Sequence, residues 1–263
     1  MTYLESHEEV LSIDLEDEND LYRIRRGRRI VYVSVLAPSI ITREDKTESC
    51  KILSNLRQIP EWYEDWQTLT VSKLGDEIRC YKNQFSPHRL RESELLVPCD
   101  KYFNVTDLKL VDRISDRVSL VMQEEKPCCL KIARFSHELT YLRQEIWAYS
   151  ILIERRFTSA PEFYGYVYEE QTDRIIGFIM EELCGRYAGI ADLQSCHTIL
   201  RQMHDVGLVH GDVNKYNFIV TKRGTRLVDF EASRVQAGNA QIQELGSLAN
   251  RLASTSREGC YRT

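Results

Sequence analysis

The stretch "LVHGDVNKYNFIV", from Leu208 to Val220, decides how the second half of the chain folds. It places His210, Asp212 and Asn217 at fixed spacing between two apolar runs, which predicts a loop between short strands. "RLVDF" follows after Gly224, and a glycine at that place predicts the turn of a hairpin. The loop therefore presents an acidic side chain and an amide five residues apart, where both can face one site.

Segments on both sides of this loop predict an α+β arrangement in two lobes. The runs "LKLVDRI", "RVSLVMQ" and "PCCLKIA" predict a meander of three antiparallel strands, and "FYGYVYEE" and "RIIGFIMEEL" predict two more. Between them, "SHELTYLRQEIWAYSILIERR" has apolar residues at helical spacing, with Ser136 as a candidate cap. Helices are also expected over "ADLQSCHTILRQMHDVG" and from Asn239 onward. The expected buried face of this last helix is Ile242, Leu245, Ala249 and Leu252.

The N-terminal part of the chain has two regions of different composition. Residues 1–29 begin with an acidic run and end with five arginines within residues 23–29, which predicts a solvated, partly disordered arm. The basic cluster is also compatible with a nuclear-targeting patch. Residues 30–104 form an N-terminal extension, with a strand-like run from Ile30 and a helix that ends before Pro60.

Composition excludes several classes of function. The formal charge of -5 argues against a nucleic-acid partner, because neutralising phosphates requires clustered Lys and Arg. The longest apolar run is too short to span a bilayer and the first residues are not typical of a secretory signal, so we expect no membrane partner. We expect a cytoplasmic, alternatively nuclear, protein whose eight irregularly spaced cysteines are reduced thiols. The oligomeric state stays open.

The candidate functional residues are polar side chains that interrupt or end apolar strands. Lys131 lies in "CCLKIA", Glu145 lies in the helix after it, and Asp229 ends the apolar run of "RLVDF". Taken alone, Lys131 has an ordinary role open to it as a strand lysine, Glu145 as an exposed helix residue and Asp212 as a turn aspartate. Their order along the chain, together with Asp212 and Asn217, is what a phosphoryl-transfer site requires.

This order resembles the protein-kinase-like superfamily over about residues 105–250. "HGDVNKYNF" and "VDFE" are more similar to the aminoglycoside and choline phosphotransferases than to ordinary protein kinases. The wider pattern, with "EIWAYSIL", "APEFYGYV" and "IIGFIMEEL", is similar to the kinase-like proteins abundant in fungal genomes. The resemblance implies a two-lobed protein-kinase-like fold. Its N-lobe would hold a five-stranded antiparallel sheet within residues 105–183, and residues 184–263 would form a short, mostly helical, minimal C-lobe.

The resemblance also implies ATP and Mg²⁺ as cofactors and a role for each candidate residue. Lys131 would contact the α- and β-phosphates, and Glu145 would hold its ammonium in position. Asn217 and Asp229 would supply hard oxygen ligands to Mg²⁺. Asp212 would then accept the proton of an incoming hydroxyl or aim that hydroxyl at the γ-phosphate.

Further positions follow from strand alternation and from the resemblance. Cys129 lies on the same strand face as Lys131, so we expect it to line the nucleotide pocket. Glu182 and Leu183 fall where the family's hinge offers backbone groups to adenine. Whether Lys215 contacts the γ-phosphate stays open. His210 is expected to support the loop by hydrogen bonding and not to act as a base.

The turn between the first two strands of the meander departs from the protein-kinase pattern. It reads "DRISDR", without the glycine that close approach of a backbone to phosphate favours. The cover over the phosphates is therefore either more open or replaced by Ser115 with Arg113 and Arg117. A plain hairpin turn with exposed arginines is the alternative.

Three functions are compatible with these residues. The first is an ATP- and Mg²⁺-dependent phosphotransferase acting on a hydroxyl, with a small-molecule acceptor preferred to a Ser/Thr protein. The second is a compact atypical Ser/Thr protein kinase similar to the small RIO-type enzymes. The third is a nucleotide-binding pseudokinase or interaction module, against which the intact set of polar residues argues. The sequence does not identify the acceptor, since its pocket is built by loops.

Overall fold

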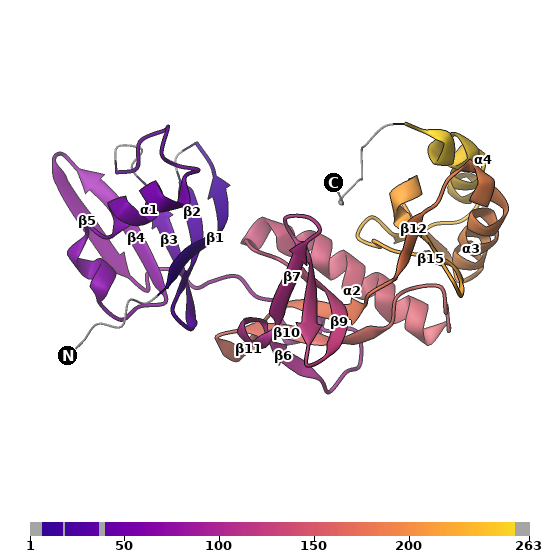
Figure 1. The fold of residues 1–263 in the computed structure, drawn as a ribbon, viewed down its shortest axis with the longest axis horizontal. Helices are drawn as coiled ribbons and strands as arrows, with labels where there is room; N and C mark the ends of the chain where they lie inside the picture. The colour runs from indigo at the N-terminus through magenta and orange to yellow at the C-terminus, as the bar shows by residue number, and fades with distance from the viewer. Residues whose placement is uncertain (1–6, 18, 37–39, 256–263) are drawn as a thin grey trace. The chain divides into compact units, whose positions relative to one another are not determined.

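The computed structural model has an α+β architecture and divides into two units (Figure 1). Unit 1 comprises Met1–His88 with Arg134–Ser136, and unit 2 comprises Arg89–Ala133 with His137–Thr263. The residues that the structure describes are 7–17, 19–36 and 40–255. The main division along the chain thus falls after residue 88, earlier than the expected boundary at residue 104.

Unit 1 is built on a five-stranded sheet in the order β1-β2-β3-β4-β5, in which β3 and β4 are parallel and the other neighbours antiparallel. The strands are β1 (Glu8–Leu15), β2 (Asp20–Arg26), β3 (Arg29–Val35), β4 (Thr68–Leu74) and β5 (Glu77–Lys82). Helix α1 (Ser49–Leu56) and the short helix η1 (Pro60–Tyr63) complete the unit. Trp62 and Trp66 are buried in its core with Tyr22 and Leu69.

The expectation of a solvated arm over residues 1–29 is wrong for the part that the structure describes. Its acidic and basic runs form β1 and β2, which pair antiparallel with Glu8 opposite Arg26 and Glu9 opposite Arg25. Both pairs are within ion-pair distance, at 3.6 and 3.7 Å. The two charge blocks therefore neutralise each other across the strands, which composition alone does not reveal. Residues 1–6 and 18 of the expected arm lie outside the described residues.

Unit 2 contains a six-stranded sheet in the order β6-β10-β11-β9-β8-β7. The strands are β6 (Tyr102–Asn104), β7 (Lys109–Arg113), β8 (Val118–Gln123), β9 (Lys126–Ile132), β10 (Phe163–Glu169) and β11 (Gln171–Glu181). The five expected antiparallel strands are all present, but the expected count is wrong because β6 adds a sixth strand, parallel to β10. In this order β9 has a neighbouring strand on each side, so Lys131 lies in the interior of the sheet and not on an edge strand.

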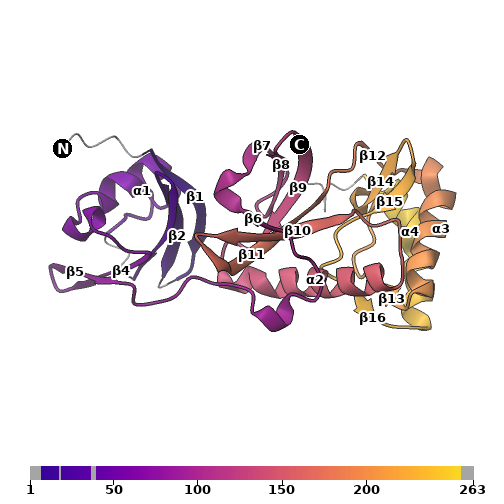
Figure 2. The same ribbon diagram turned by 90° about the horizontal axis from the view of Figure 1, so that it is seen from below.

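Helices and small sheets make up the rest of unit 2, and Figure 2 shows α3 beside α4. The helices are α2 (Leu139–Glu154), α3 (Leu193–Asp205) and α4 (Asn239–Ala253). The short strands are β12 (Gly185–Tyr187), β14 (Phe218–Thr221) and β15 (Gly224–Leu227) in one sheet, and β13 (Leu208–Val209) with β16 (Arg234–Val235) in another. None of the described helices is both long and apolar enough to cross a membrane.

Two details of the helices differ from the sequence-based expectations. Ser136 does not cap α2, because it begins the short helix η4 (Ser136–Glu138) and no side chain caps α2. The buried face of α4 is rotated, since Leu248 and Leu252 are buried whereas Ile242 is 68% exposed. The spacing of apolar residues correctly predicted this helix, but the prediction of its buried face was wrong.

Gly177 in β11 makes a close approach to β9 that a side chain would prevent. A Cβ at this position would lie 2.3 Å from the carbonyl oxygen of Lys131 and 2.8 Å from Cγ2 of Ile132. We expect Gly177→Ala to lower the free energy of unfolding of unit 2 by about 1–3 kcal/mol, because the strand that carries Lys131 must shift.

Urea unfolding measures this difference, and Gly246→Ala in α4 is the control, since no atom lies within 4 Å of its added Cβ. Alanine at that helical position is expected to stabilise by about 0.5–1 kcal/mol. A Gly177→Ala protein as stable as the wild type would contradict the close packing of β9 against β11.

Candidate functional site

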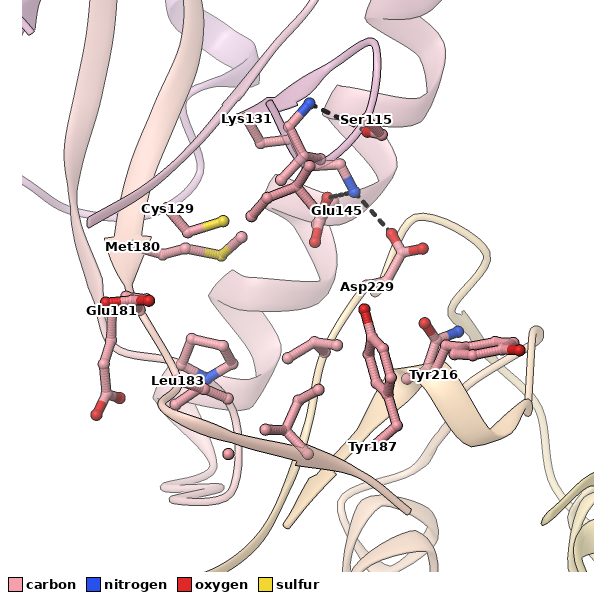
Figure 3. Close-up of a pocket in the computed structure, with 18 of the residues that line it drawn as sticks. Ser115, Cys129, Lys131, Glu145, Met180, Glu181, Leu183, Tyr187, Tyr216 and Asp229 are labelled. Atoms are coloured by element: carbon pink, nitrogen blue, oxygen red, sulfur yellow. Dashed lines mark hydrogen bonds and ion pairs between the residues drawn. The ribbon is translucent and has the colours of Figure 1, made fainter. Parts of the chain in front are cut away.

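Unit 2 contains a cavity of about 340 Å³ beside Lys131 (Figure 3). Its wall comes from β9, from the end of β11, from β12 and from the segments around Asn217 and Asp229. The volume lies in the range of small-molecule sites. The cavity is therefore large enough to bind part or all of a nucleotide-sized ligand.

Three carboxylates surround the ammonium of Lys131. Its Nζ lies 2.5 Å from Oε2 of Glu145, 2.7 Å from Oδ1 of Asp229 and 3.1 Å from Oε2 of Glu231. Lys131 is 3% exposed and Glu145 is fully buried. Burying charges this deeply is costly unless they are paired, so the four groups depend on one another.

Glu145 connects two distant parts of the chain at this cluster. It points from α2 toward Lys131 in β9, and its Oε1 accepts a hydrogen bond from the backbone N–H of Phe230 at 3.3 Å. Removing either partner of a buried ion pair typically costs about 3–5 kcal/mol, because the other charge stays buried and unpaired. Glu145 thus fixes both the lysine and the segment that carries Asp229.

The pKa values of the cluster follow from burial and from its charges. Burial alone would lower the pKa of Lys131, but the carboxylates of Asp229, Glu145 and Glu231 more than offset it and raise the pKa well above its ordinary value. Burial raises the pKa of Glu145 despite its contact with Lys131. For Asp229, Lys131 outweighs burial and lowers the pKa. Lys131 is therefore a permanent cation, and Asp229 is a carboxylate at neutral pH.

Asp229 has a backbone conformation that few residues adopt. Its φ is +66°, in the left-handed region, which costs about 1–2 kcal/mol for most residues with a side chain. The conformation ends the run after β15 and directs the carboxylate toward Lys131. Strain of this kind, held by a buried ion pair, is a common feature of binding sites.

Arg117 is one of the residues that line the cavity. It lies just before β8 in the glycine-free turn, and its guanidinium donates to both carboxylate oxygens of Glu231, at 2.9 and 2.8 Å. The ring of Tyr141 lies 5.1 Å from its Cζ. Ser115 also lines the cavity and accepts the N–H of Val118 at 3.2 Å. Of the three residues proposed for this turn, Ser115 and Arg117 thus face the cavity, whereas Arg113 lies in exposed strand β7.

The loop after β13 holds Asp212 through hydrogen bonds to amides. Nδ2 of Asn217 donates to the carbonyl oxygen of Asp212 at 2.8 Å and to its Oδ2 at 3.1 Å, and Nδ2 of Asn214 donates to the same Oδ2 at 2.9 Å. Asn217 lines the cavity through η6 (Lys215–Asn217), and Asp212 is exposed beside it. Because the nitrogen of Asn217 is engaged with Asp212, its amide oxygen is the atom left for a ligand.

His210 supports this loop from within the protein. Its Nε2 lies 3.0 Å from the carbonyl oxygen of Val228, and the N–H of Asp212 donates to its Nδ1 at 3.4 Å. These two contacts fix the orientation of the imidazole ring. His210 is fully buried, so it positions Asp212 and is not itself available to a substrate.

Glu244 of α4 anchors the backbone of the same loop. Its carboxylate accepts the N–H of Gly211 at 2.6 Å and that of His210 at 3.1 Å, and lies 2.8 Å from Nε2 of His204. Gly211 has a φ of +86°, and a Cβ there would lie 2.1 Å from the carbonyl oxygen of Ala232. The loop therefore requires both a glycine and a buried acceptor for two backbone donors.

The remaining wall is apolar and aromatic. Cys129 and Met180 are cross-strand neighbours and lie side by side in Figure 3, while Cys128 is buried on the opposite face in a separate cluster. Cys129, like the other described cysteines, forms no disulfide. Across the cavity, the rings of Tyr187 and Tyr216 meet edge to face at 5.0 Å. Apolar walls on two sides suit a flat ring system.

The end of β11 gives the cavity its main-chain edge. The last pair in the ladder joins Glu181 of β11 to Cys128 of β9. Glu182 and Leu183 follow beyond that pair and line the cavity. They therefore lie where their backbone groups are outside the sheet ladder, as expected for a segment that contacts a ligand.

Most of the residues expected from the sequence thus gather around one cavity. The residues that line it are Ser115, Cys129, Lys131, Glu145, Glu182, Leu183, Asn217 and Asp229. Asp212 and Lys215 do not line it. Asp212 accepts a hydrogen bond from Asn217, which does. The ammonium of Lys215 instead donates to the carbonyl oxygen of Ser254, just past α4, at 2.7 Å. The end of a helix leaves carbonyl groups without partners, and this interaction satisfies that need instead of a phosphate contact.

The donor set is compatible with a divalent metal ion. Oxygen atoms of Glu145, Asp229 and Glu231 lie within 4.8 Å of one another. Carboxylate and amide oxygens are the ligands that Mg²⁺ prefers, and Asn217 adds an amide oxygen nearby. Glu145 is fully buried and bonded to both Lys131 and Phe230, whereas Asp229 and Glu231 are half-buried, so Asp229, Asn217 and Glu231 are the residues best suited to hold a metal ion.

Sequence reasoning missed two interactions of this site. The partnership of Arg117 with Glu231 joins residues 114 positions apart, and no spacing rule predicts it. Glu244 lies in an ordinary amphipathic helix, and nothing in its neighbourhood distinguishes it from a solvated glutamate. The left-handed glycine of "HGD" was the available signal, since a strained loop requires anchoring.

Comparison with known proteins adds no family to this geometry. No protein-family model matches the chain. No curated protein matches its sequence either.

Glu244 gives the loop a testable dependence on pH. Burial alone would raise its pKa, but hydrogen bonds from His204 and from the N–H groups of Gly211 and His210 lower it below the ordinary value. A lowered pKa means that the carboxylate stabilises the native state above its unfolded pKa and that this contribution is lost as the pH falls through the folded value. Glu244→Gln should therefore reduce amide protection of residues 208–213 by about 1–3 kcal/mol near neutral pH.

Hydrogen exchange followed by mass spectrometry measures this protection. The gap between wild type and Glu244→Gln should shrink as the pH falls below about 4.5, because the protonated carboxyl resembles the amide. Glu154→Gln, at an exposed position of α2, is the control and should leave protection unchanged. A gap independent of pH would show that the carboxylate does not hold the loop.

Proposed function

We propose that unit 2 is an ATP- and Mg²⁺-dependent phosphotransferase that moves the γ-phosphate to a hydroxyl acceptor, on a two-lobed protein-kinase-like fold. The observation that carries this proposal is the buried contact of Lys131 with Glu145 and Asp229 at the wall of the cavity. A loop that pairs Asp212 with Asn217 borders the same cavity. A permanent cation, a carboxylate at neutral pH and an amide in this order are what positioning of a triphosphate requires.

The charges of the cluster support binding of a metal–nucleotide complex. Lys131 and Arg117 face Glu145, Asp229 and Glu231, which leaves one negative charge in excess. Such a site repels a bare triphosphate and attracts a divalent cation. When bound, Mg²⁺ would neutralise charge on the phosphates and orient them, held by Asp229 with Asn217 and Glu231. Lys131, relieved of part of its carboxylate contact, would then bind phosphate oxygens.

The adenine would lie against the apolar walls of the cavity. Cys129 and Met180 form one wall, and the backbone groups of Glu182 and Leu183 offer hydrogen bonds at its edge. Arg117, now bonded to Glu231, could bind a phosphate oxygen instead. Its side chain would then take the role of the glycine-rich turn that covers the phosphates in protein kinases.

Asp212 is the group suited to receive the proton of the acceptor. The new bond forms between the acceptor oxygen and the γ-phosphorus, and the bond from that phosphorus to the β-phosphate oxygen breaks to release ADP. The acceptor proton passes to a carboxylate oxygen of Asp212, whose other contacts with Asn214 and Asn217 keep it in place. The buried His210 keeps the backbone of this loop fixed.

The same contacts argue for an enzyme over a pseudokinase. A module that only binds nucleotide does not need Asp212 oriented by two amide side chains and its loop anchored by Glu244. Ordering Asp212 and its loop costs conformational entropy, and in the proposed mechanism Asp212 and Glu244 do not contact the nucleotide. Turnover is therefore the property to test.

Replacing Asp212 by Asn tests this function. We expect Asp212→Asn to lower kcat by about 10²- to 10⁴-fold and to leave MgATP affinity within about twofold, because the amide still bonds to its neighbours but cannot accept the proton. The measurement is transfer of label from [γ-³²P]ATP to a small-molecule extract and to peptide pools. Asp205→Asn, an exposed aspartate at the end of α3, is the matched control and should retain full turnover.

Two results would refute the proposal. Wild-type protein that neither binds MgATP nor transfers label to any pool is not a phosphotransferase. Equal turnover in wild type and Asp212→Asn would remove Asp212 from the chemistry.

A further inference from the structure

A second cavity, of about 270 Å³, follows the loop that carries Asp212. Gly211 and Val213, the two neighbours of Asp212 in the chain, line this cavity. Asp212 is also bonded to Asn217, which lines the first cavity. Asp212 itself lines neither cavity, but a residue bonded to it lines the first and its two chain neighbours line the second.

One face of α4 forms the opposite wall of the second cavity. The residues of α4 that line it are Ala240, Gln243, Glu244, Ser247 and Arg251. Their spacing of three and four places them along a single face of the helix. This face is fixed to the loop at two points, through Glu244 to the amides of His210 and Gly211 and through Ser254 to Lys215. The wall is therefore held in place against the loop.

The charge available in the second cavity is positive. Arg234 and Arg251 line it, and within the part of the chain that the structure describes neither forms an ion pair with a carboxylate. Nε of Arg234 donates to Gln236, which leaves its two terminal nitrogens. The carboxylate of Glu244 is engaged with backbone N–H groups and His204. Among the residues that the structure describes, these two guanidinium groups thus have no carboxylate paired with them.

Both arginines lie on elements that pack against the loop. Arg234 of β16 pairs with Val209 of β13, the residue directly before His210. Arg251 lies seven residues beyond Glu244, which corresponds to roughly 10 Å along the helix axis. The elements that carry both arginines thus contact the loop of Asp212.

We propose that this second cavity binds the phosphate acceptor, and that the acceptor is a small molecule carrying a phosphate or carboxylate group in addition to the hydroxyl that receives the γ-phosphate. The inference rests on the function proposed above and names the class of its acceptor. Guanidinium groups suit both kinds of anion, because their planar donors pair with two oxygens at once. The anion is bound by Arg234 and Arg251, and this directs the hydroxyl of the acceptor toward Asp212.

The test uses the full-length protein, Mg²⁺, [γ-³²P]ATP and a small-molecule extract separated by anion exchange into anionic and neutral pools. Part of the anionic pool is treated with a phosphatase, which is then removed. We expect label in the anionic pool to exceed that in the neutral pool by at least about tenfold. Loss of label after phosphatase treatment identifies a phosphate-bearing acceptor, and its retention identifies a carboxylate-bearing one.

Arginine variants connect this preference to the second cavity. Arg234→Gln and Arg251→Gln should each lower kcat/KM for the anionic pool by about tenfold, because each loses a charged hydrogen bond to the acceptor. Their affinity for MgATP should equal that of the wild type, which also shows that they are folded. Arg223→Gln, in the exposed turn between β14 and β15, is the matched control and should behave as wild type.

The outcomes separate this inference from the function on which it rests. Label in the neutral pool at an equal level, label only on peptides, or binding of MgATP without transfer to any pool would overturn the acceptor class. Arginine variants as active as the wild type would overturn the location. If the wild type does not bind MgATP at all, the proposed function itself fails and this inference fails with it.

Discussion

The ammonium of Lys131 holds the candidate site together. It enters from the central strand β9 and meets carboxylates from helix α2 and from the segment after β15. None of these groups could be buried alone, because an unpaired charge at this depth costs several kcal/mol. The ion-pair cluster therefore forms only when the sheet, helix α2 and the segment around Asp229 are packed together. The same packing forms the walls of the cavity. The phosphates of a bound nucleotide would take the place of some of the carboxylate contacts that Lys131 already makes.

A second constraint acts on the loop that carries Asp212. Its backbone passes through a left-handed glycine, and two of its N–H groups would lack partners without Glu244. Helix α4 thus has two effects, since it anchors the loop and supplies the wall of the second cavity. In the proposed acceptor site, rigidity of the loop and recognition of the acceptor would both depend on this helix. A substitution on α4 should for this reason be examined for both effects.

The sequence was sufficient for the parts of the site that interrupt apolar strands. Lys131 and Asp229 stand out in such strands, and Glu145 and Asn217 follow from their order, so their shared cavity could be expected. Pairings between distant charges were not predictable in the same way. Glu8 and Glu9 pair with arginines of the next strand. From composition alone, the acidic run and the basic run were both expected to be solvated. Glu231 with Arg117 is a similar case at the site. Long-range ion pairs depend on register and on chain geometry, which local patterns do not contain.

The central claim is that the cavity beside Lys131 binds MgATP, and Cys129 provides the most direct test. Its thiol lines the cavity, whereas Cys50 is exposed in unit 1. Alkylation by a small thiol reagent, mapped by mass spectrometry with and without saturating MgATP, compares the two. The account predicts that MgATP slows modification of Cys129 by at least about tenfold and leaves Cys50 unchanged, because bound adenine would cover the wall that Cys129 forms. Modification of Cys129 at the same rate with and without MgATP would contradict it.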